Sequence, residues 1–287
     1  MSFWTSQLLN ALSFGALLFL VSAGLSLILG LMRIVSVAHG SFYMLGAYIA
    51  LATLTASHSY PLAIVAAILT MLVLGALLQR TLIERVGSDP LRQVLLTFGF
   101  LLVVGDAALA MWSGSPAIIP VPPFLAGSVA VGSAHYPLYR IAVIFLGLGL
   151  AFVLDRVQTG THLGALVRAG ADDLEMLSCM GVNVRRLFVW VFAFGTALAG
   201  FGGAVGGVFL GVYPGVDLEI GFLGFVVVIV GGLGSIRGTL AASLIVALID
   251  TLSKSLFPEI SLFAIFLLLI VVIAIRPTGL FGRRSLA

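Results

Sequence analysis

Nine apolar stretches dominate this sequence, and most of them are long enough to cross a bilayer. They cover residues 8–32, 36–54, 61–80, 93–113, 137–154, 187–210, 220–236, 238–254 and 260–276. A transmembrane helix needs about 20 consecutive apolar residues to span a hydrocarbon core about 30 Å thick. The second, seventh and eighth stretches are short or interrupted by glycine. We therefore expect an all-α integral membrane protein, a polytopic bundle of about 8–9 transmembrane helices that forms one domain over 1–287.

The composition supports this class and excludes others. Hydrophobic residues make up 61% of the chain and charged residues 9%, whereas a soluble domain carries about 25% charged residues. The net charge of +3 is too small to indicate a nucleic-acid partner. Cys179 is the only cysteine, which excludes an internal disulfide, and the four histidines lack the spacing of a metal site. Because Lys254 is the only lysine, no Walker A loop is present and we expect no catalysis by this chain.

The basic residues are concentrated in three polar stretches. These are 80–92, 155–186 and the C-terminal tail, whereas 114–136 carries no charge and 211–219 carries only acidic residues. Basic loops remain on the cytosolic side of a membrane. We therefore place the three basic stretches and the C-terminus in the cytosol. With nine spans, the N-terminus then lies outside.

The segment AHGSFYMLGAYIA, residues 38–50, begins the short second stretch. His39 and Gly40 interrupt the apolar run, and Tyr43, Gly46 and Tyr48 follow. A glycine-weakened helix is tolerated in lipid where protein or a water-filled cavity receives its backbone groups. Broken helices near the midplane commonly line solute paths. The segment therefore either lines such a path or forms a packing kink in which His39 is hydrogen-bonded to a neighbouring helix.

A second glycine-rich segment, IVGGLGSIRGTLAASL, covers residues 229–244. Gly231, Gly232, Gly234 and Gly238 cluster around Arg237, so a continuous helix is not expected here. Two alternatives remain open. Either a tight cytosolic turn joins two spans, or a half-helix ends and re-enters as a structured break that supports a solute path.

The longest polar stretch, 155–186, contains a pattern that predicts one short amphipathic helix. At about 100° per residue, one face is apolar: Leu163, Leu166, Gly170, Leu174 and Leu177. The opposite face is largely polar: Arg168, Asp172, Glu175 and Cys179. Gly181 suits the C-cap of this helix. The helix carries both signs of charge and no aromatic anchor, which favours docking on a protein partner over the alternative of lying on the membrane surface.

Asp106 is a carboxylate inside the fourth apolar stretch. Such a group costs on the order of 2.5–3.5 kcal/mol on insertion scales, so we expect it to face the bundle interior, near His39 or Arg140. It is either a paired structural acid or a proton-coupling group. The second alternative gives a different function class, a proton- or ion-coupled secondary transporter or channel that uses Asp106. In the sixth stretch, Gly203, Gly207 and Gly211 repeat at four-residue spacing, which predicts close helix packing.

Four segments together resemble one family, the inner-membrane permease subunits of branched-chain amino acid ABC importers of the high-affinity leucine–isoleucine–valine type. The segments are GLMRIVSVAHGSFYMLGAY (30–48), RAGADDLEMLSCMGVNVRRL (168–187), VGGLGSIRGTLAASLIVALIDTL (230–252) and RPTGLFGR (276–283). The resemblance extends over nearly the whole chain. It implies a multi-pass protein of the bacterial inner membrane, with short or broken helices near the solute path and the N-terminus in the periplasm.

The resemblance also implies partners and roles. The partners are a second, homologous permease subunit, two ATPase subunits that hydrolyse ATP, and a periplasmic solute-binding protein, while this chain binds no cofactor itself. The solute path is expected at His39, Gly40, Ser41, Tyr43, Met44, Gly46, Asp106, Gly231, Gly232, Gly234 and Ser235. ATPase coupling within the cytosolic loop 155–186 is expected at Arg168, Ala169, Asp172, Asp173, Glu175, Gly181 and Arg185.

This sequence departs from the family pattern in ways that concern the solute and the ATPase partner. The family commonly has Asn-Phe-Ala-His-Gly-Glu, whereas Ser36 and Ser41 stand here in place of the Asn and the Glu. A small residue is usual in the coupling loop at the position of Leu177. Branched-chain amino acids are the family's usual solutes, and relatives of this subclass take urea, short amides or aromatic and other carboxylates.

Overall fold

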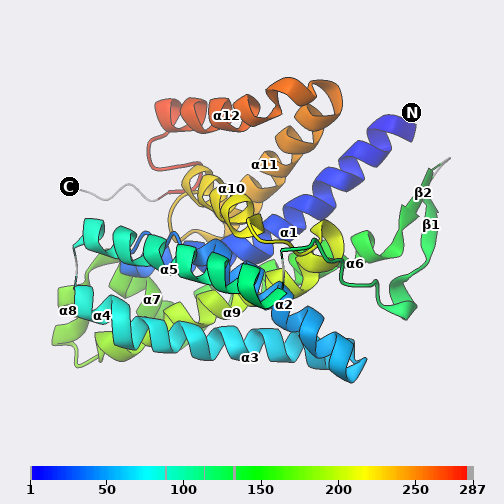
Figure 1. Cartoon of the computed structure of the whole chain (residues 1–287). Helices are drawn as coiled ribbons and strands as arrows, with labels where there is room; N and C mark the ends of the chain where they lie inside the picture. The colour runs from blue at the N-terminus through cyan, green and yellow to red at the C-terminus, as the bar shows by residue number, and fades with distance from the viewer. Residues whose placement is uncertain (1, 88, 113, 132–133, 283–287) are drawn as a thin grey trace.

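The computed structural model describes residues 2–87, 89–112, 114–131 and 134–282, and nearly all of this chain is helical (Figure 1). The long helices are α1 (Ser2–Met32), α2 (His39–Ser57), α3 (Tyr60–Leu78), α5 (Pro90–Trp112), α6 (Leu138–Gly160), α9 (Val184–Leu210), α10 (Val216–Gly231), α11 (Ile236–Leu256) and α12 (Ser261–Ile275). A π-helical turn (Gln79–Ile83) joins α3 to the short α4 (Glu84–Val86), and α7 (His162–Asp172) and α8 (Leu174–Cys179) lie between α6 and α9.

Each predicted apolar stretch overlaps one of these long helices. Within the described residues, six helices are long and apolar enough to cross a membrane, namely α1, α3 with its extension through α4, α5, α6, α9 and α11. The remaining long helices, α2, α10 and α12, do not meet that measure. The protein is therefore a helical membrane protein, and the count of eight or nine spans stays a prediction.

Two short strands, β1 (Ser128–Val131) and β2 (Ala134–Pro137), form an antiparallel hairpin in the stretch between α5 and α6. The sequence predicted only an uncharged loop here. The same stretch is tied to the segment between α9 and α10, because the backbones of Ala117 and Val212 exchange hydrogen bonds of 2.8 and 2.7 Å. Figure 1 shows the hairpin and the N-terminus at one end of the molecule.

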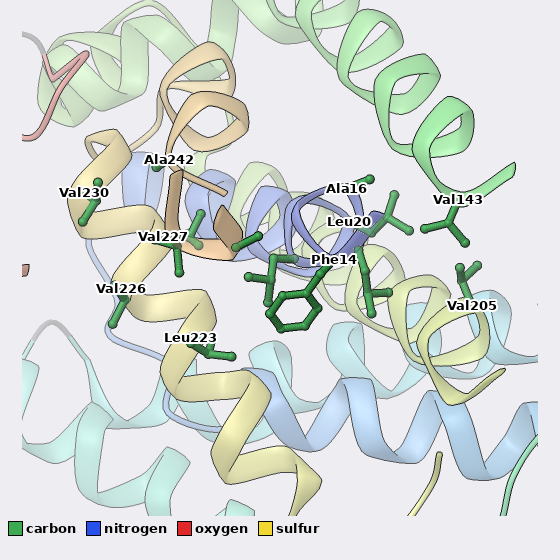
Figure 2. Close-up of a cluster of buried hydrophobic side chains, with 14 of the residues drawn as sticks. Phe14, Ala16, Leu20, Val143, Val205, Leu223, Val226, Val227, Val230 and Ala242 are labelled. Carbon is green, nitrogen blue, oxygen red and sulfur yellow. The ribbon is translucent and has the colours of Figure 1, made fainter. Parts of the chain in front are cut away.

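The core is built around α1 and α9. In their most apolar segments, 89% of α1 and 72% of α9 is buried, whereas only 22% of α5 and of α6 is buried, so the latter two present most of their surface to the surroundings. Figure 2 shows apolar side chains of α1, α6, α9, α10 and α11 converging. They include Phe14, Leu20, Val143, Val205, Leu223, Val227 and Ala242.

Most of the arginines lie at the end of the molecule opposite the hairpin. We call this the basic end; it carries α4, α7, α8 and the C-terminal segment 276–282 (Figure 1). Its arginines include Arg33, Arg80, Arg85, Arg92, Arg156, Arg168, Arg185, Arg186, Arg237 and Arg276. Arg140, at the start of α6, lies toward the other end. Arg283 and Arg284, part of the predicted basic tail, are outside the described residues.

Candidate functional site: the α2 start, the α10–α11 turn and the α7–α8 pair

The break predicted near His39 lies before this residue. An irregular segment, 33–38, follows α1, and α2 then runs without interruption from His39 to Ser57. His39 and Gly40 therefore begin a helix and do not interrupt one. The physical reason is the tight contact of α2 with its neighbours, which leaves no room for a kink inside the helix.

His39 is fully buried and packs against α1. Its Nε2 lies 3.0 Å from the carbonyl oxygen of Val21, and since a carbonyl only accepts, Nε2 carries the proton in this contact. This bond is the packing interaction that the sequence offered as one alternative. Nδ1 of the same ring has no hydrogen-bond partner within the described chain, so the ring presents one open acceptor to the interior.

Gly40 and Gly46 bring α2 into backbone contact with two other helices. A Cβ on Gly40 would overlap the carbonyl oxygen of Asp217 at the start of α10. A Cβ on Gly46 would come 2.5 Å from the Cα of Gly200 in α9. Small residues allow such approaches between membrane helices. The two glycines are thus required by packing, whatever else this region does.

The N-terminal ends of α2 and α10 meet in the interior of the protein. Ser41 donates a hydrogen bond of 3.4 Å from Oγ to Oδ2 of Asp217, and both side chains are buried. Asp217 occupies the first turn of α10, where the positive end of the helix dipole favours a carboxylate. The sequence had placed Asp217 only in an outer acidic loop. Its position just after Gly215 and before an apolar run is the signal that could have identified a helix start.

Among the residues that the structure describes, six of the nine buried side-chain polar atoms without a hydrogen-bond partner lie in α1, α2 and the segment between them. These six are His39 Nδ1 and the hydroxyls of Ser22, Ser26, Ser36, Tyr43 and Tyr48. A buried polar group that makes no hydrogen bond is costly. Tyr43 and Met44 are completely buried, so the predicted path residues of α2 line the protein interior and not an outer surface. Such a set of open polar groups is what a passing polar solute or water would satisfy.

The segment after α10 forms a tight turn. α10 ends at Gly231 and α11 begins at Ile236, with Gly232 and Gly234 at φ values of 96° and 75°. Ser235 caps α11 by accepting a 3.1 Å hydrogen bond from the amide of Gly238. The C-terminal segment supports the turn, because the amide of Leu280 donates to the carbonyl of Val230 at 2.8 Å. The structure therefore has a tight turn between two helices at this segment, and because α10 is not among the six helices long enough to cross a membrane, both predicted alternatives stay predictions.

Arg237 connects this turn to α6. Its Nε and Nη2 lie 2.7 and 2.9 Å from the two carboxylate oxygens of Asp155. This bidentate arrangement is the strongest geometry available to an arginine–carboxylate pair. The sequence singled out Arg237 but did not predict this partner, because 82 positions separate the two residues.

The polar stretch 155–186 forms two helices where the sequence predicted one. α6 continues to Gly160, so the separate loop begins later than expected, and α7 ends at Asp172. Asp173 interrupts the helix in an extended conformation and caps α8 by accepting a 2.9 Å hydrogen bond from the amide of Met176. Aspartate competes for backbone donors in this way, and such local bonding favours helix starts over helix interiors.

The predicted faces of this stretch are only partly right. Leu177 and Gly170 are buried, but Leu163, assigned to the apolar face, is 63% exposed. The coupling residues Ala169, Asp172, Asp173, Glu175, Gly181 and Arg185 are exposed and Arg168 is half-buried. Gly181 follows the end of α8 with φ at 83°, as expected for a helix C-terminus. Arg185 pairs with Glu84 of α4, which fixes the start of α9 against α4.

Asp106 contradicts the sequence-based placement. It was expected to face the bundle interior near His39 or Arg140, but its side chain is exposed on the outer face of α5. The buried face of that helix is formed by Gln93, Thr97, Leu101, Val104 and Ala108. Asp106 follows Val104 by two residues, about 200° around the helix, and so points away from the core.

The short connection before α10 carries one further polar pair. Tyr213 donates a 2.9 Å hydrogen bond to Glu219. Partial burial and this bond to a carboxylate raise the pKa of Tyr213 to about 12. The phenol therefore stays neutral at physiological pH and holds the connection against α10.

The structure separates the predicted path residues into three places. Those of α2 lie in the interior beside Asp217, Asp106 lies on the outside of α5, and Gly234 and Ser235 line a groove at the basic end together with Arg33 and Arg168. In the part of the chain that is described, no group of three or more histidine, cysteine, aspartate or glutamate side chains could hold a metal ion.

Comparison with known proteins places the chain in a family. Residues 7–275 match the family described as branched-chain amino acid transport system / permease component. The chain belongs to this permease family. It is 27% identical to the high-affinity branched-chain amino acid transport system permease protein BraD of Pseudomonas aeruginosa, over 98% of this chain and 96% of that protein. It is 28% identical to the corresponding permease proteins LivH of Salmonella typhimurium and Escherichia coli, with the same coverage.

No solved structure matches the permease. The fold is therefore known from the helices described above, and the family is known from the match over nearly the whole chain. This family consists of transport components and not of enzymes, in agreement with the expectation drawn from the sequence.

Proposed function

We propose that this permease is the membrane subunit of an ATP-driven importer that moves branched-chain amino acids, or a related small polar solute, across the bacterial inner membrane. The match to the permease component over residues 7–275 carries this proposal. The relatives named above are permeases of high-affinity branched-chain amino acid transport systems. In this proposal the energy for uphill transport comes from ATP hydrolysis by the ATPase partner.

The α7–α8 pair is proposed as the element through which that energy enters. It projects from the basic end, exposes residues of both charge signs, and is joined to the bundle through the buried Leu177 and Gly170. Charged groups on a rigid helix favour a specific protein contact. Closure of the ATPase pair would then pull on α7 and α8 and tip the bundle between outward-open and inward-open states.

The partners proposed for this permease are a second homologous permease subunit, two ATPase subunits and a periplasmic solute-binding protein. The chain itself binds no cofactor. The concentration of arginines at one end supports a cytosolic location for that end. The C-terminus is then cytosolic, and the N-terminus and the β-hairpin lie in the periplasm.

Reconstitution tests the proposal. The permease is purified with its partner permease and ATPase subunits, placed in proteoliposomes, and supplied with the solute-binding protein and radiolabelled leucine. We expect leucine to accumulate only with ATP on the ATPase side. Leucine uptake driven by a proton or sodium gradient without ATP would contradict the proposal and favour the secondary-transporter alternative.

A further inference from the structure

A large groove opens at the basic end, between the ends of α1 and α6, α7, the α10–α11 turn and the C-terminal segment. Its volume is about 1040 Å³, above the roughly 300–1,000 Å³ of most small-molecule sites. Its lining combines three arginines (Arg33, Arg168 and Arg237) and two aspartates (Asp155 and Asp172) with a long apolar wall. The lining thus carries an excess of one positive charge, which favours a ligand with an anionic part and an extended apolar part.

Two guanidinium groups in the groove keep hydrogen-bonding capacity. Arg33, directly after α1, makes one long bond of 3.4 Å from Nη2 to the carbonyl of Ala171. Nη1 of Arg168 is buried and has no hydrogen-bond partner in the described chain. The third arginine, Arg237, is already engaged by both carboxylate oxygens of Asp155. Arg33, which is exposed, is therefore the group that can contact an anion directly, and the half-buried Arg168 adds positive charge to the same groove.

The apolar wall is more exposed than a protein interior allows. Leu233 and Phe281 are 57% and 54% exposed, and Ile229 is exposed at the end of α10. Ile229 continues an exposed stripe on α10 that includes Leu218 and Phe222, because positions 218, 222 and 229 fall on one side of a helix. The groove is thus continuous with a face of α10 suited to lipid.

We propose that this groove binds an anionic phospholipid of the cytosolic leaflet. Arg33 binds its phosphate, the positive charge of Arg168 attracts it, and the acyl chains lie along the wall formed by Ile229, Leu233 and Phe281. Basic pockets between helices at the cytosolic surface favour such headgroups. A free inorganic phosphate offers the same anionic chemistry but would leave the apolar wall uncovered.

Native mass spectrometry of the purified, delipidated permease tests the site with two added lipids, dioleoylphosphatidylglycerol and dioleoylphosphatidylcholine. We expect one tightly bound phosphatidylglycerol that excess inorganic phosphate does not displace. In Arg33→Gln/Arg168→Gln its affinity should fall about 30-fold, since each arginine near the surface contributes roughly fivefold. Arg33→Gln alone should bind phosphatidylglycerol about fivefold more weakly. This single variant tests the site if the double variant does not fold.

The matched control is Arg80→Gln/Arg85→Gln, which removes two exposed arginines from the same end of the molecule but outside the groove. It should keep the wild-type affinity for phosphatidylglycerol. Equal binding of the two lipids, an equal loss in the control, or displacement by inorganic phosphate would each overturn the proposal.

Discussion

Single glycines decide how closely the helices of this permease approach one another. Gly40 lies against the backbone of α10 at Asp217, and Gly203 of α9 lies against the carbonyl of Tyr43 in α2. Bilayer lipid supplies no hydrophobic drive for helices to associate, so close van der Waals packing has to hold them together. The interior of α2 is therefore sensitive to the addition of one methyl group.

Gly40→Ala should destabilise the permease by roughly 1–3 kcal/mol, the usual cost of overpacking, because the new Cβ would overlap the carbonyl of Asp217. The measurement is the thermal unfolding midpoint of the detergent-purified protein. Gly99→Ala is the control: Gly99 is also helical, but nothing lies within 4 Å of its added Cβ. If both variants melt at the same temperature, the contact between α2 and α10 is not as tight as described.

Asp106 bears on the choice between function classes. It lies on the outer face of α5, away from the buried polar groups of α2. In Asp106→Asn we expect ATP-driven leucine uptake by the reconstituted complex to remain close to wild type. A carrier that uses Asp106 to bind a proton would instead lose uptake, because asparagine does not titrate. If the variant complex assembles normally but loses ATP-driven uptake, Asp106 does take part in the solute path.

Among the elements, the α7–α8 pair depends on two backbone features. Asp173 separates and caps the second helix, and Gly181 ends it with a positive φ. A β-branched residue at such a φ costs roughly 1–3 kcal/mol of strain. A change at Gly181 therefore alters the direction in which α8 leads into α9 and leaves the membrane helices intact.

In Gly181→Val we expect membrane insertion and ATP hydrolysis to be retained while leucine uptake falls about tenfold. Both rates are measured in the same proteoliposomes. Gly181→Asn is the matched control, because asparagine tolerates a left-handed backbone, and it should keep uptake near the wild-type rate. Wild-type uptake in the valine variant would show that energy does not enter through α8.

The positions of the long helices were predictable from the lengths of the apolar stretches. The residues at which those helices begin and end were not. The stretch 187–210 corresponds to α9, and Gly203 in it makes the close helix contact that its spacing predicted. Gly207 instead packs against Ile119 in the connection after α5, and Gly211 ends α9 with φ at 83°. Equal spacing does not distinguish these uses, because each depends on a segment distant in the sequence.

The same limit applies to the candidate site. Sequence alone singled out His39 and predicted that no continuous helix passes through the glycines at 231–234, since polar and glycine residues stand out in apolar runs. It did not predict that Ser41 meets Asp217, which lies 176 positions away. It also placed Asp106 inside the bundle, because the cost of a carboxylate in lipid was assumed to be met within one chain.

At the scale of the whole molecule, the arginines are concentrated at one of the two ends. The basic end carries α7, α8 and the C-terminal segment, and the β-hairpin lies at the opposite end (Figure 1). Such an asymmetry orients a protein during insertion. The exposed Cys179, the last residue of α8, provides a direct reporter of that orientation, because the chain contains no other cysteine.

A membrane-impermeant maleimide should label Cys179 in inside-out vesicles and leave it unlabelled in intact spheroplasts. The matched variant Cys179→Ser/Ser128→Cys moves the thiol to the exposed hairpin and should show the reverse pattern. Labelling of Cys179 from the outside would invert the proposed topology, and with it the side on which the ATPase docks.

The unequal lengths of the peripheral helices have a consequence for the surrounding bilayer. The apolar helix α3 has 19 residues, a length of about 28 Å, which matches a hydrocarbon core of about 30 Å. The 15 residues of α12 extend for only about 22 Å, so a bilayer that α12 crosses must thin beside it. This hydrophobic mismatch makes the tilt of the permease, and so the angle at which α7 and α8 face the cytosol, sensitive to membrane thickness.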